Sequence, residues 1–313
     1  MSKLNPREKF RTSIGGQALI EGVMMRGPSL LALAVRDPAG EIEVETQPLR
    51  PNPVAKIPLL RGVVAFVDSL VLGYRCILRS AEISMTEEEK EEDKDKFDLW
   101  LEKHFGERAE KAVMTASAVA GGLLAIVLFM ILPTFLTGLL AKAVPLGGFK
   151  TLVEGVLKLS IFVLYLFVIS RMKEVSRLFR YHGAEHKTIA TYESDEELTV
   201  ENVRKNSRFH PRCGTSFLLL VLLISILVFS FVPWHSTLGR VGLKLLLLPV
   251  VMGLSYEAIK FAGRHDNPLT RVISAPGLWL QRLTTAEPDD SMIEVAIASV
   301  KAVLPKEGED ASW

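Results

Sequence analysis

Long uninterrupted runs of apolar residues dominate the second half of the chain. Residues 113–132 and 215–234 contain no charged side chain, and residues 151–171 and 240–261 contain only a few. Each run has about the 20 residues that an α-helix needs to cross the hydrocarbon core of a bilayer. The pattern predicts an α-helical membrane protein with four transmembrane helices, forming a bundle over residues 113–264.

Polar residues and prolines within these runs suggest local features. The first predicted span ends at Pro133, and Pro249 is expected to kink the fourth. Glu154 and Lys158 are four residues apart in the second span. That spacing would let their side chains pair on one face of the helix.

Basic residues indicate how the predicted helices are oriented. Short loops rich in Lys and Arg stay on the cytoplasmic side of a membrane. Residues 172–214, between the second and third predicted spans, hold far more Lys and Arg than the short loops on the opposite side. We therefore expect this histidine-containing loop to be cytoplasmic. Because the number of predicted spans is even, both termini should lie on the same side.

The region before the spans has a different pattern. Residues 11–56 contain β-prone runs, and "DPAG" at residues 37–40 separates two of them as a turn would. We predict a small cytoplasmic α+β unit built from this N-terminal segment. Residues 57–112 are predicted to form an amphipathic helix, lying at the membrane interface, packed on the spans or partly inserted, followed by a charged linker. Residues 265–305 are predicted to be cytoplasmic C-terminal helices.

Charge and cysteine content narrow the classes of function. The 313 residues include 37 Lys and Arg and 36 Asp and Glu, for a formal net charge of +1. A chain this close to neutrality has no basic field to attract nucleic acid, so no nucleic acid is expected as a partner. The two cysteines, Cys76 and Cys213, lie far apart and fit no disulfide framework.

The segment "YHGAEHKTIATYE" at residues 181–193 carries the main candidate chemistry. We expect the helix of the second span to continue through it, although Gly183 weakens a helix at this point. At 100° per residue, His182, His186 and Glu193 would lie within about 40° of one another. Two imidazoles and a carboxylate on one face are suitable ligands for zinc or a similar divalent ion.

Glu185 lies about 60° to the side of His182 on the same predicted helix. The order H-x-x-E-H is the inverted zinc-protease pattern, in which the glutamate next to the ligands takes a proton from water. Glu185 is therefore the candidate general base. A plainer alternative is that His182 and His186 are ordinary interfacial residues, with neighbouring basic side chains facing lipid headgroups.

More candidate ligands should reach the same membrane depth. "FHPRCG" places His210 and Cys213 just before the third span, and Glu257 lies near the cytoplasmic end of the fourth, followed by His265 and Asp266. Glu257 could instead pair with Lys260 or with an arginine. The full set of candidate metal ligands is His182, His186, Glu193, His210, Cys213 and Glu257. A closed site of His182, His186, His210 and Cys213 would be structural, whereas a site with one open position would be catalytic.

Four segments carry a resemblance to a known family. "GGQALIEGVMMRGP", "PLLRGVVAFVDSLVLGYRCILRSA", "YHGAEHKTIATYE" and "RFHPRCGTSFLL" together resemble the YqhQ-like bacterial membrane proteins. That family has a domain of unknown function, and its members are described as predicted metal-dependent enzymes. The resemblance implies a multi-pass protein of the bacterial inner membrane. The matching segments carry over His182, Glu185, His186, Glu193, His210 and Cys213.

The first of these segments is rich in glycine. Its polar residues Gln17, Glu21 and Arg26 could complete a site, and the alternative is a glycine-rich strand edge. Taken together, the observations predict a metal-dependent hydrolase at the cytoplasmic membrane interface, using a divalent metal such as zinc. Its substrate would be a peptide bond in a membrane protein or a lipid-linked ester. The alternative is a non-enzymatic membrane scaffold or assembly factor with a structural His/Cys site.

Overall fold

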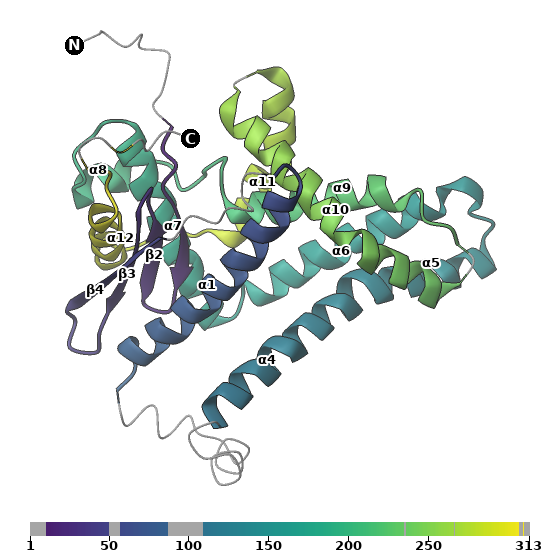
Figure 1. Ribbon diagram of the computed structural model, residues 1–313, viewed down its shortest axis with the longest axis horizontal. Helices are drawn as coiled ribbons and strands as arrows, with labels where there is room; N and C mark the ends of the chain where they lie inside the picture. Colours follow the sequence, from purple (N-terminus) through teal and green to yellow (C-terminus); the bar gives the residue numbers. More distant parts are fainter. Residues whose placement is uncertain are drawn as a thin grey trace. The chain divides into compact units, whose positions relative to one another are not determined.

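The computed structural model describes residues 11–49, 57–86, 109–234, 236–265, 267–306 and 309. These residues form two compact units, each assembled from segments that are distant in the sequence. The first unit contains the described parts of Met1–Ser84, Leu166–Val221 and Pro249–Trp313, and the second contains those of Met85–Tyr165 and Leu222–Leu248. Figure 1 follows the chain through both. Most of the predicted charged linker lies outside the described residues.

The first unit contains a four-stranded antiparallel sheet in the order β1-β2-β3-β4. The strands are β1 (Gly15–Leu19), β2 (Gly22–Arg26), β3 (Leu30–Arg36) and β4 (Ile42–Pro48). This arrangement confirms the predicted β-rich N-terminal segment. The turn at residues 37–40 is also present, with Gly40 N donating to Asp37 O at 3.0 Å. Gly40 has a φ of +90°, which a residue without Cβ adopts at little cost.

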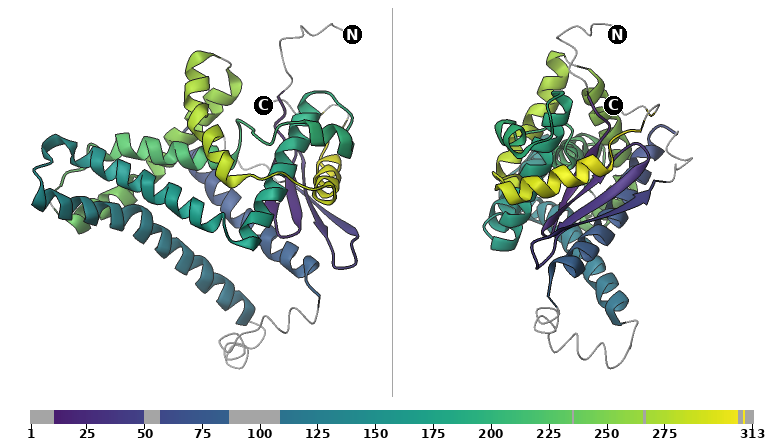
Figure 2. Two further views of the ribbon diagram at one scale, coloured as in Figure 1. Left: turned by 180° about the vertical axis from the view of Figure 1, so that it is seen from behind. Right: turned by 90° about the vertical axis from the view of Figure 1, so that its left-hand side faces the viewer.

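Helices cover both faces of this sheet. One face packs against α7 (Lys173–Glu193) and α12 (Asp290–Ala302), and the other packs against α1 (Leu60–Ser84). Successive strand residues point to opposite faces, so the two cores alternate along each strand. Figure 2 shows yellow α12 lying across the purple strands. The core toward α7 and α12 includes Ala18, Val23, Met25, Ala32 and Ala34, and the core toward α1 includes Leu19, Met24, Leu31, Leu33 and Val35.

The predicted amphipathic helix is α1. Its buried residue Cys76 lies in the core on the α1 side of the sheet. Near its start, a Cβ at Gly62 would lie 2.6 Å from the Tyr256 side chain of α10 (Thr237–Arg264). The opposite side of α1 keeps apolar side chains such as Leu70 exposed. Helix α1 therefore packs on the sheet and on α10, and its remaining face presents exposed apolar side chains.

Within the described residues, three helical segments are long and apolar enough to span a membrane: Thr115–Ala143, Gly147–Ile169 and Thr237–Arg264. The other predicted span corresponds to α9 (Gly214–Phe229), an apolar helix of 16 residues. It ends several residues earlier than the apolar run in the sequence. The structure thus supports the prediction of membrane helices, but α9, at the third predicted span, is shorter than predicted.

The first span continues through Pro133, contrary to the prediction. It consists of α4 (Ala109–Ile126), a π-helical turn at Val127–Ile131 and α5 (Leu132–Ala143). Proline has no amide hydrogen to donate, and Pro133 lies in the first turn of α5, where that loss is tolerated. The wider π-helical turn comes directly before it and re-routes the backbone hydrogen bonds.

Two further expectations for the second span are wrong. The helix does not run unbroken into the histidine segment, because α6 (Lys150–Ile169) ends before α7 begins at Lys173. Met172 between them has extended backbone and acts as the N-cap of α7. Glu154 does not pair with Lys158 but with Arg240, at 2.7 Å, and with Lys244. Arg240 and Lys244 of α10 therefore pair with Glu154, in place of Lys158 on the same helix as Glu154.

The C-terminal helices are confirmed as helices. α11 (Pro268–Thr284) begins with a capping box in which Asn267 and Thr270 exchange hydrogen bonds. α12 begins at the N-cap Asp289, whose carboxylate accepts from Met292 N at 3.1 Å. The short segment between these helices lies against α7 and takes part in the site described next.

Candidate metal centre

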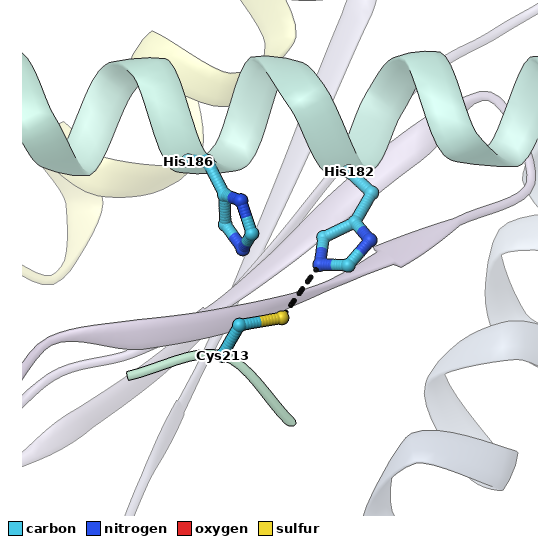
Figure 3. Close-up of side chains that lie close together, drawn as sticks. All are labelled: His182, His186 and Cys213. Carbon is cyan, nitrogen blue, oxygen red and sulfur yellow. Dashed lines mark hydrogen bonds between the residues drawn. The ribbon is translucent and has the colours of Figure 1, made fainter. Parts of the chain in front are cut away.

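Helix α7 places two histidine side chains on the same face of the first unit. His182 and His186 are separated by about one helical turn, so their rings lie side by side with centroids 4.4 Å apart. Figure 3 shows both rings pointing from α7 toward Cys213. His186 is 1% exposed, so its imidazole depends entirely on the groups around it.

A backbone carbonyl group forms a hydrogen bond with Nδ1 of each histidine ring. His182 Nδ1 lies 2.8 Å from Thr284 O, and His186 Nδ1 lies 2.6 Å from Arg208 O. A carbonyl oxygen only accepts, so each Nδ1 must carry the hydrogen. In a neutral ring this leaves the lone pair on Nε2. Histidines that bind metals are oriented in this way, by a carbonyl or carboxylate on the other nitrogen.

Cys213 supplies a third donor from a different part of the chain. It lies directly before α9, and its Sγ is 3.2 Å from His182 Nε2. Thr215 N donates to the same sulfur at 3.4 Å. One donor atom each from His182, His186 and Cys213 lies within 4.8 Å of the other two. Two nitrogens and one sulfur at this separation match the donor types of a tetrahedral zinc site.

Glu185 lies beside these three residues, and only one of its two carboxylate oxygens accepts a hydrogen bond from the described residues. Its Oε1 accepts from Gly16 N of β1 at 3.0 Å, and its Oε2 is 3.9 Å from His182 Nε2. Both Glu185 Oε2 and His186 Nε2 are buried, and neither has a hydrogen-bond partner among the described residues. A buried polar atom without a partner costs about 1–3 kcal/mol, so two together need an explanation.

The electrostatics of the cluster favour ionised sulfur. Burial alone would raise the pKa of the Cys213 thiol, but the positive charge of His182 and His186 lowers it well below its usual range. Burial would lower the pKa of His182, yet Cys213 and then Glu185 raise it to about 9. Burial raises the pKa of Glu185 against the opposing effect of both histidines. The cluster thus holds a thiolate, imidazole nitrogens and a carboxyl group that accepts protons readily.

Two kinds of chemistry fit a thiolate next to imidazoles. A Cys–His pair can act as a nucleophile and base, or its atoms can bind a soft or borderline cation. A nucleophilic pair needs Cys213 and one histidine only. It leaves the partnerless nitrogen of His186 and the partnerless oxygen of Glu185 without a role. A cation among the donors would satisfy the nitrogen of His186 together with the thiolate.

Glu193, His210 and Arg212 form a separate network next to this cluster. Glu193 accepts from Thr12 N at 2.8 Å and from Arg212, and its Oε2 is 3.4 Å from His210 Nε2. Burial would raise the pKa of Glu193, but His210 and Arg212 lower it. The ring of His210 lies 5.6 Å from that of His186, centroid to centroid. Glu193 and His210 therefore support the cluster from outside it.

The remaining candidates lie elsewhere in the first unit. Glu257 pairs with Arg61 of α1 through both carboxylate oxygens, so it is committed to an arginine. His265 is exposed, and its Nδ1 lies 3.0 Å from Phe261 O of α10, the helix that it follows. Glu21 pairs with Arg177 and accepts from the Tyr181 hydroxyl at 3.1 Å. Asp266 lies outside the described residues.

The structure adds three backbone groups that the sequence did not point to: Gly16 N, Arg208 O and Thr284 O. Main-chain groups leave no mark in a residue pattern. Glycine at position 16 was the one usable signal, since a Cβ there would lie 2.5 Å from Met24 O and 3.1 Å from Glu185 Cγ. Close approach of strand β1 to Glu185 therefore requires glycine.

Gly183 has a similar role between the two histidines. A Cβ at this position would lie 2.0 Å from the carbonyl oxygen of Ala286. Ala286 N donates to Phe179 O at 2.8 Å, which fastens the segment after α11 to α7. Gly183 thus lets that segment come close enough for Thr284 O to reach His182. Its value for packing outweighs its low helix propensity.

Comparison with known proteins places the chain in a family. Residues 57–306 match the family model described as "Protein of unknown function (DUF1385)". The chain is 34% identical over 306 residues to "Uncharacterized protein YqhQ" from Bacillus subtilis (strain 168), across 95% of this chain and 94% of that protein. No solved structure matches the chain. The resemblance seen in the four sequence segments is confirmed, and the chain belongs to the DUF1385 family of YqhQ-like proteins.

Proposed function

We propose that His182, His186 and Cys213 bind a divalent metal ion, with zinc as the best fit. The observation that carries the proposal is the pair of buried atoms without partners, His186 Nε2 and Glu185 Oε2, beside the Cys213 thiolate. Each histidine already donates its Nδ1 hydrogen to a carbonyl, so its Nε2 faces the cluster, where a bound cation would take the place of a proton. Imidazole nitrogen and thiolate sulfur are the ligands that zinc prefers.

The best-supported activity for such a centre is hydrolysis. His182, His186 and Cys213 would hold the ion, and a zinc ion with three protein ligands would act as a Lewis acid toward a carbonyl group. In this proposal Glu185 Oε2 takes the proton from an attacking water. As water adds to the carbonyl carbon, that proton passes to Glu185 and then to the leaving nitrogen or oxygen. Glu185 is the general base in this proposal.

We infer the class of substrate from the apolar helices, which could hold the site at a membrane surface. Apolar helices long enough to span a bilayer accompany the cluster in one chain. We propose a protein of the bacterial inner membrane with α9 as a fourth spanning or partly spanning helix, and with both termini and α7 on the cytoplasmic side. A site at that surface would act on a peptide bond of a membrane protein or on a lipid-linked ester. No nucleic acid is needed as a partner.

Burial favours a second candidate function. Cys213 is 6% exposed and Glu185 is 4% exposed, while the His182 side chain retains 13%. Donors this enclosed are typical of structural zinc sites, in which the metal stabilises the fold. The protein would then be a membrane scaffold or assembly factor, and the ion would fasten α7 to the segment before α9.

Metal analysis of purified variants separates these functions. The wild-type protein, purified in detergent without chelator, should contain stoichiometric zinc, and His186→Ala should lose it. His265→Ala is the matched control, because His265 is exposed and, among the described residues, its imidazole bonds only to Phe261 O of the preceding helix. For a hydrolase, Glu185→Gln should keep the ion and lose cleavage of a quenched peptide or a fluorogenic lipid ester in mixed micelles.

Other results of these measurements would exclude the metal site or favour a different function. Wild-type protein without stoichiometric metal would overturn the proposal of a metal site. If Glu185→Gln keeps the ion and the thermal stability, and the wild type cleaves neither probe, the structural function is favoured. Cleavage that survives complete removal of the metal but not Cys213→Ser would instead identify a thiol nucleophile.

A further inference from the structure

A second cluster of charged side chains lies inside the second unit, within the helices long enough to span a membrane. Glu154 of α6 accepts from Arg240 at 2.7 Å and from Lys244, both on α10. Thr134 of α5 donates to the same carboxylate. Exposure ranges from 1% for Arg240 and Lys244 to 3% for Glu154. The carboxylate has both of its oxygens bonded and is fully neutralised by the two cations.

Lys158 adds a further positive charge to this cluster. It is 5% exposed, and among the described residues its ammonium has one hydrogen-bond acceptor, Ser225 Oγ at 3.0 Å. An ammonium group has three hydrogens to donate. The nearest carboxylate, Glu154, is already used by Arg240 and Lys244. Cations therefore outnumber carboxylates in the described part of this cluster, in a place where an unpaired charge is strongly destabilising.

The face of the Phe229 ring gives both lysines a weak electron-rich contact. Lys158 Nζ lies 4.8 Å and Lys244 Nζ 5.6 Å from the ring centroid, which offsets only part of their positive charge. Glu154 and Lys158 lie in the first half of α6, and Arg240 and Lys244 lie in the first half of α10. The N-terminal end of a helix carries partial positive charge over its first turn, so α6 favours an anion near Thr151, whereas Lys158 and Lys244 lie beyond the first turns of their helices.

A small cavity opens beside Lys158. Its volume is about 10 Å³, and it is lined by Thr151, Glu154, Gly155, Lys158, Ile226 and Phe229. That is close to the space of one bound water or one halide ion. Thr151 Oγ1 already accepts from Trp234 Nε1 at 3.3 Å and from Arg240 at 3.4 Å. Its own hydroxyl hydrogen is therefore free to point to an acceptor.

From these contacts we infer that the second unit binds a small monovalent anion, with chloride as the physiological candidate, between Lys158 and Thr151. The anion completes the charge balance of the cluster and accepts from the Lys158 ammonium and the Thr151 hydroxyl. Larger oxyanions exceed the cavity. The inference is independent of the metal centre, which is built from other residues in the first unit.

A purely structural function for the cluster makes a different prediction. Arg240 donates to Val232 O and to Phe229 O at 3.3 Å, which caps the end of α9. With Glu154 it therefore fastens α6, α9 and α10 together regardless of any ion. In that case Lys158 would be uncharged or hydrated by a water molecule, and chloride would have no specific effect.

The test is the thermal unfolding midpoint of the full-length protein in detergent, measured with sodium chloride and with sodium gluconate at matched ionic strength. A bound anion stabilises the folded state in proportion to the logarithm of its concentration above its dissociation constant. We expect a saturable rise of several degrees with chloride or bromide and little change with gluconate. Lys158→Met should abolish the difference. The control Lys142→Met, at an exposed position of α5, should retain it.

Thr151→Val is the second variant, for the case that Lys158→Met does not fold. It should weaken chloride dependence severalfold while Lys158 remains in place. Bromide-soaked crystals of the wild type should show anomalous density beside Lys158. Equal stabilisation by chloride and gluconate, or the same chloride response in wild type, Lys158→Met and Thr151→Val, would overturn the inference.

Discussion

Nδ1 of His186 lies 2.6 Å from the carbonyl oxygen of Arg208. The side chain of Arg208 in turn donates to the carbonyl oxygen of Thr285, the residue after the one that holds His182. One arginine therefore links the two backbone segments that orient the two histidines. Both rings depend on that link for the direction of their Nε2 atoms.

Replacing this arginine should weaken metal binding without removing a ligand. Arg208→Met keeps the backbone carbonyl but frees the segment at Thr285, so the rings lose part of their alignment. Groups that orient metal ligands typically change affinity by about 10–100-fold when they are removed. Zinc competition with a fluorescent chelator measures the effect. Lys205→Met is the control, since its pair with Glu201 is exposed and contributes little. Equal affinity in Arg208→Met and wild type would contradict the prediction.

Gly183→Ala should damage both the fold and the site. The new Cβ would lie 2.0 Å from Ala286 O, so the segment after α11 must move away from α7. Overpacking of this kind costs about 1–3 kcal/mol, and here it also pulls Thr284 O from His182. We expect a lower unfolding midpoint together with weaker zinc binding. At Gly15 a Cβ meets nothing within 4 Å, so Gly15→Ala should leave both measurements nearly unchanged.

The N-cap of α12 should make stability depend on pH in the acidic range. Burial would raise the pKa of Asp289, but hydrogen bonds from Ser291 Oγ and Met292 N hold it below its ordinary value of 3.8. A carboxylate with a lowered pKa stabilises the fold fully above the ordinary value, and this contribution is lost as pH falls through the lowered one. Asp289→Ala should cost about 0.5–2 kcal/mol at neutral pH and progressively less below pH 3.8.

Asp289→Asn provides the control for this pH effect. Asparagine is also a good N-cap, because its side-chain oxygen accepts the same hydrogen bond, but it does not titrate. Denaturant unfolding of the three proteins across the acidic range distinguishes them. An Asp289→Ala deficit that stays constant down to the lowest pH would show that the carboxylate charge contributes nothing at this cap.

The cluster of Glu154, Arg240 and Lys244 should be sensitive to loss of Glu154, the one carboxylate that the described residues supply to it. Glu154→Gln leaves Arg240 and Lys244 buried without their counter-charge, which typically costs about 3–5 kcal/mol. Removing Lys244 as well, one of the two cations left without a counter-charge, should restore part of the lost stability. The double variant Glu154→Gln, Lys244→Met is therefore expected to unfold at a higher temperature than Glu154→Gln alone. Thermal unfolding in detergent gives both values, and additive losses would argue against direct coupling.

Residue patterns predicted the parts of this fold that depend on local periodicity. The alternating strands, the turn ending at Gly40 and the helix over residues 60–84 follow from spacing and turn chemistry. The break at Met172 and the continuation through Pro133 were not predicted, because each depends on how a backbone tightens or widens over a single turn.

The site was predictable to the extent that side chains define it. The four-residue spacing of His182 and His186 implied neighbouring rings, and Cys213 was expected at the same level because the chain returns there. Glu257 shows the limit of that argument. It lies near the C-terminal end of α10, as expected, yet Arg61 lies close enough to bond to both of its oxygens. Depth in a bundle does not specify which helix faces which, and that choice assigns the partners.

The hydrogen bond from His182 to Thr284 joins residues 102 positions apart, and that from Gly16 to Glu185 joins residues 169 positions apart. A ribosome making this chain releases the outer strand first and the last carbonyl only near the end of synthesis. The ring of His182 cannot be oriented until α9, α10 and α11 have been made. Under the proposed metal site, loading of an ion would therefore be a late event in the biogenesis of the protein.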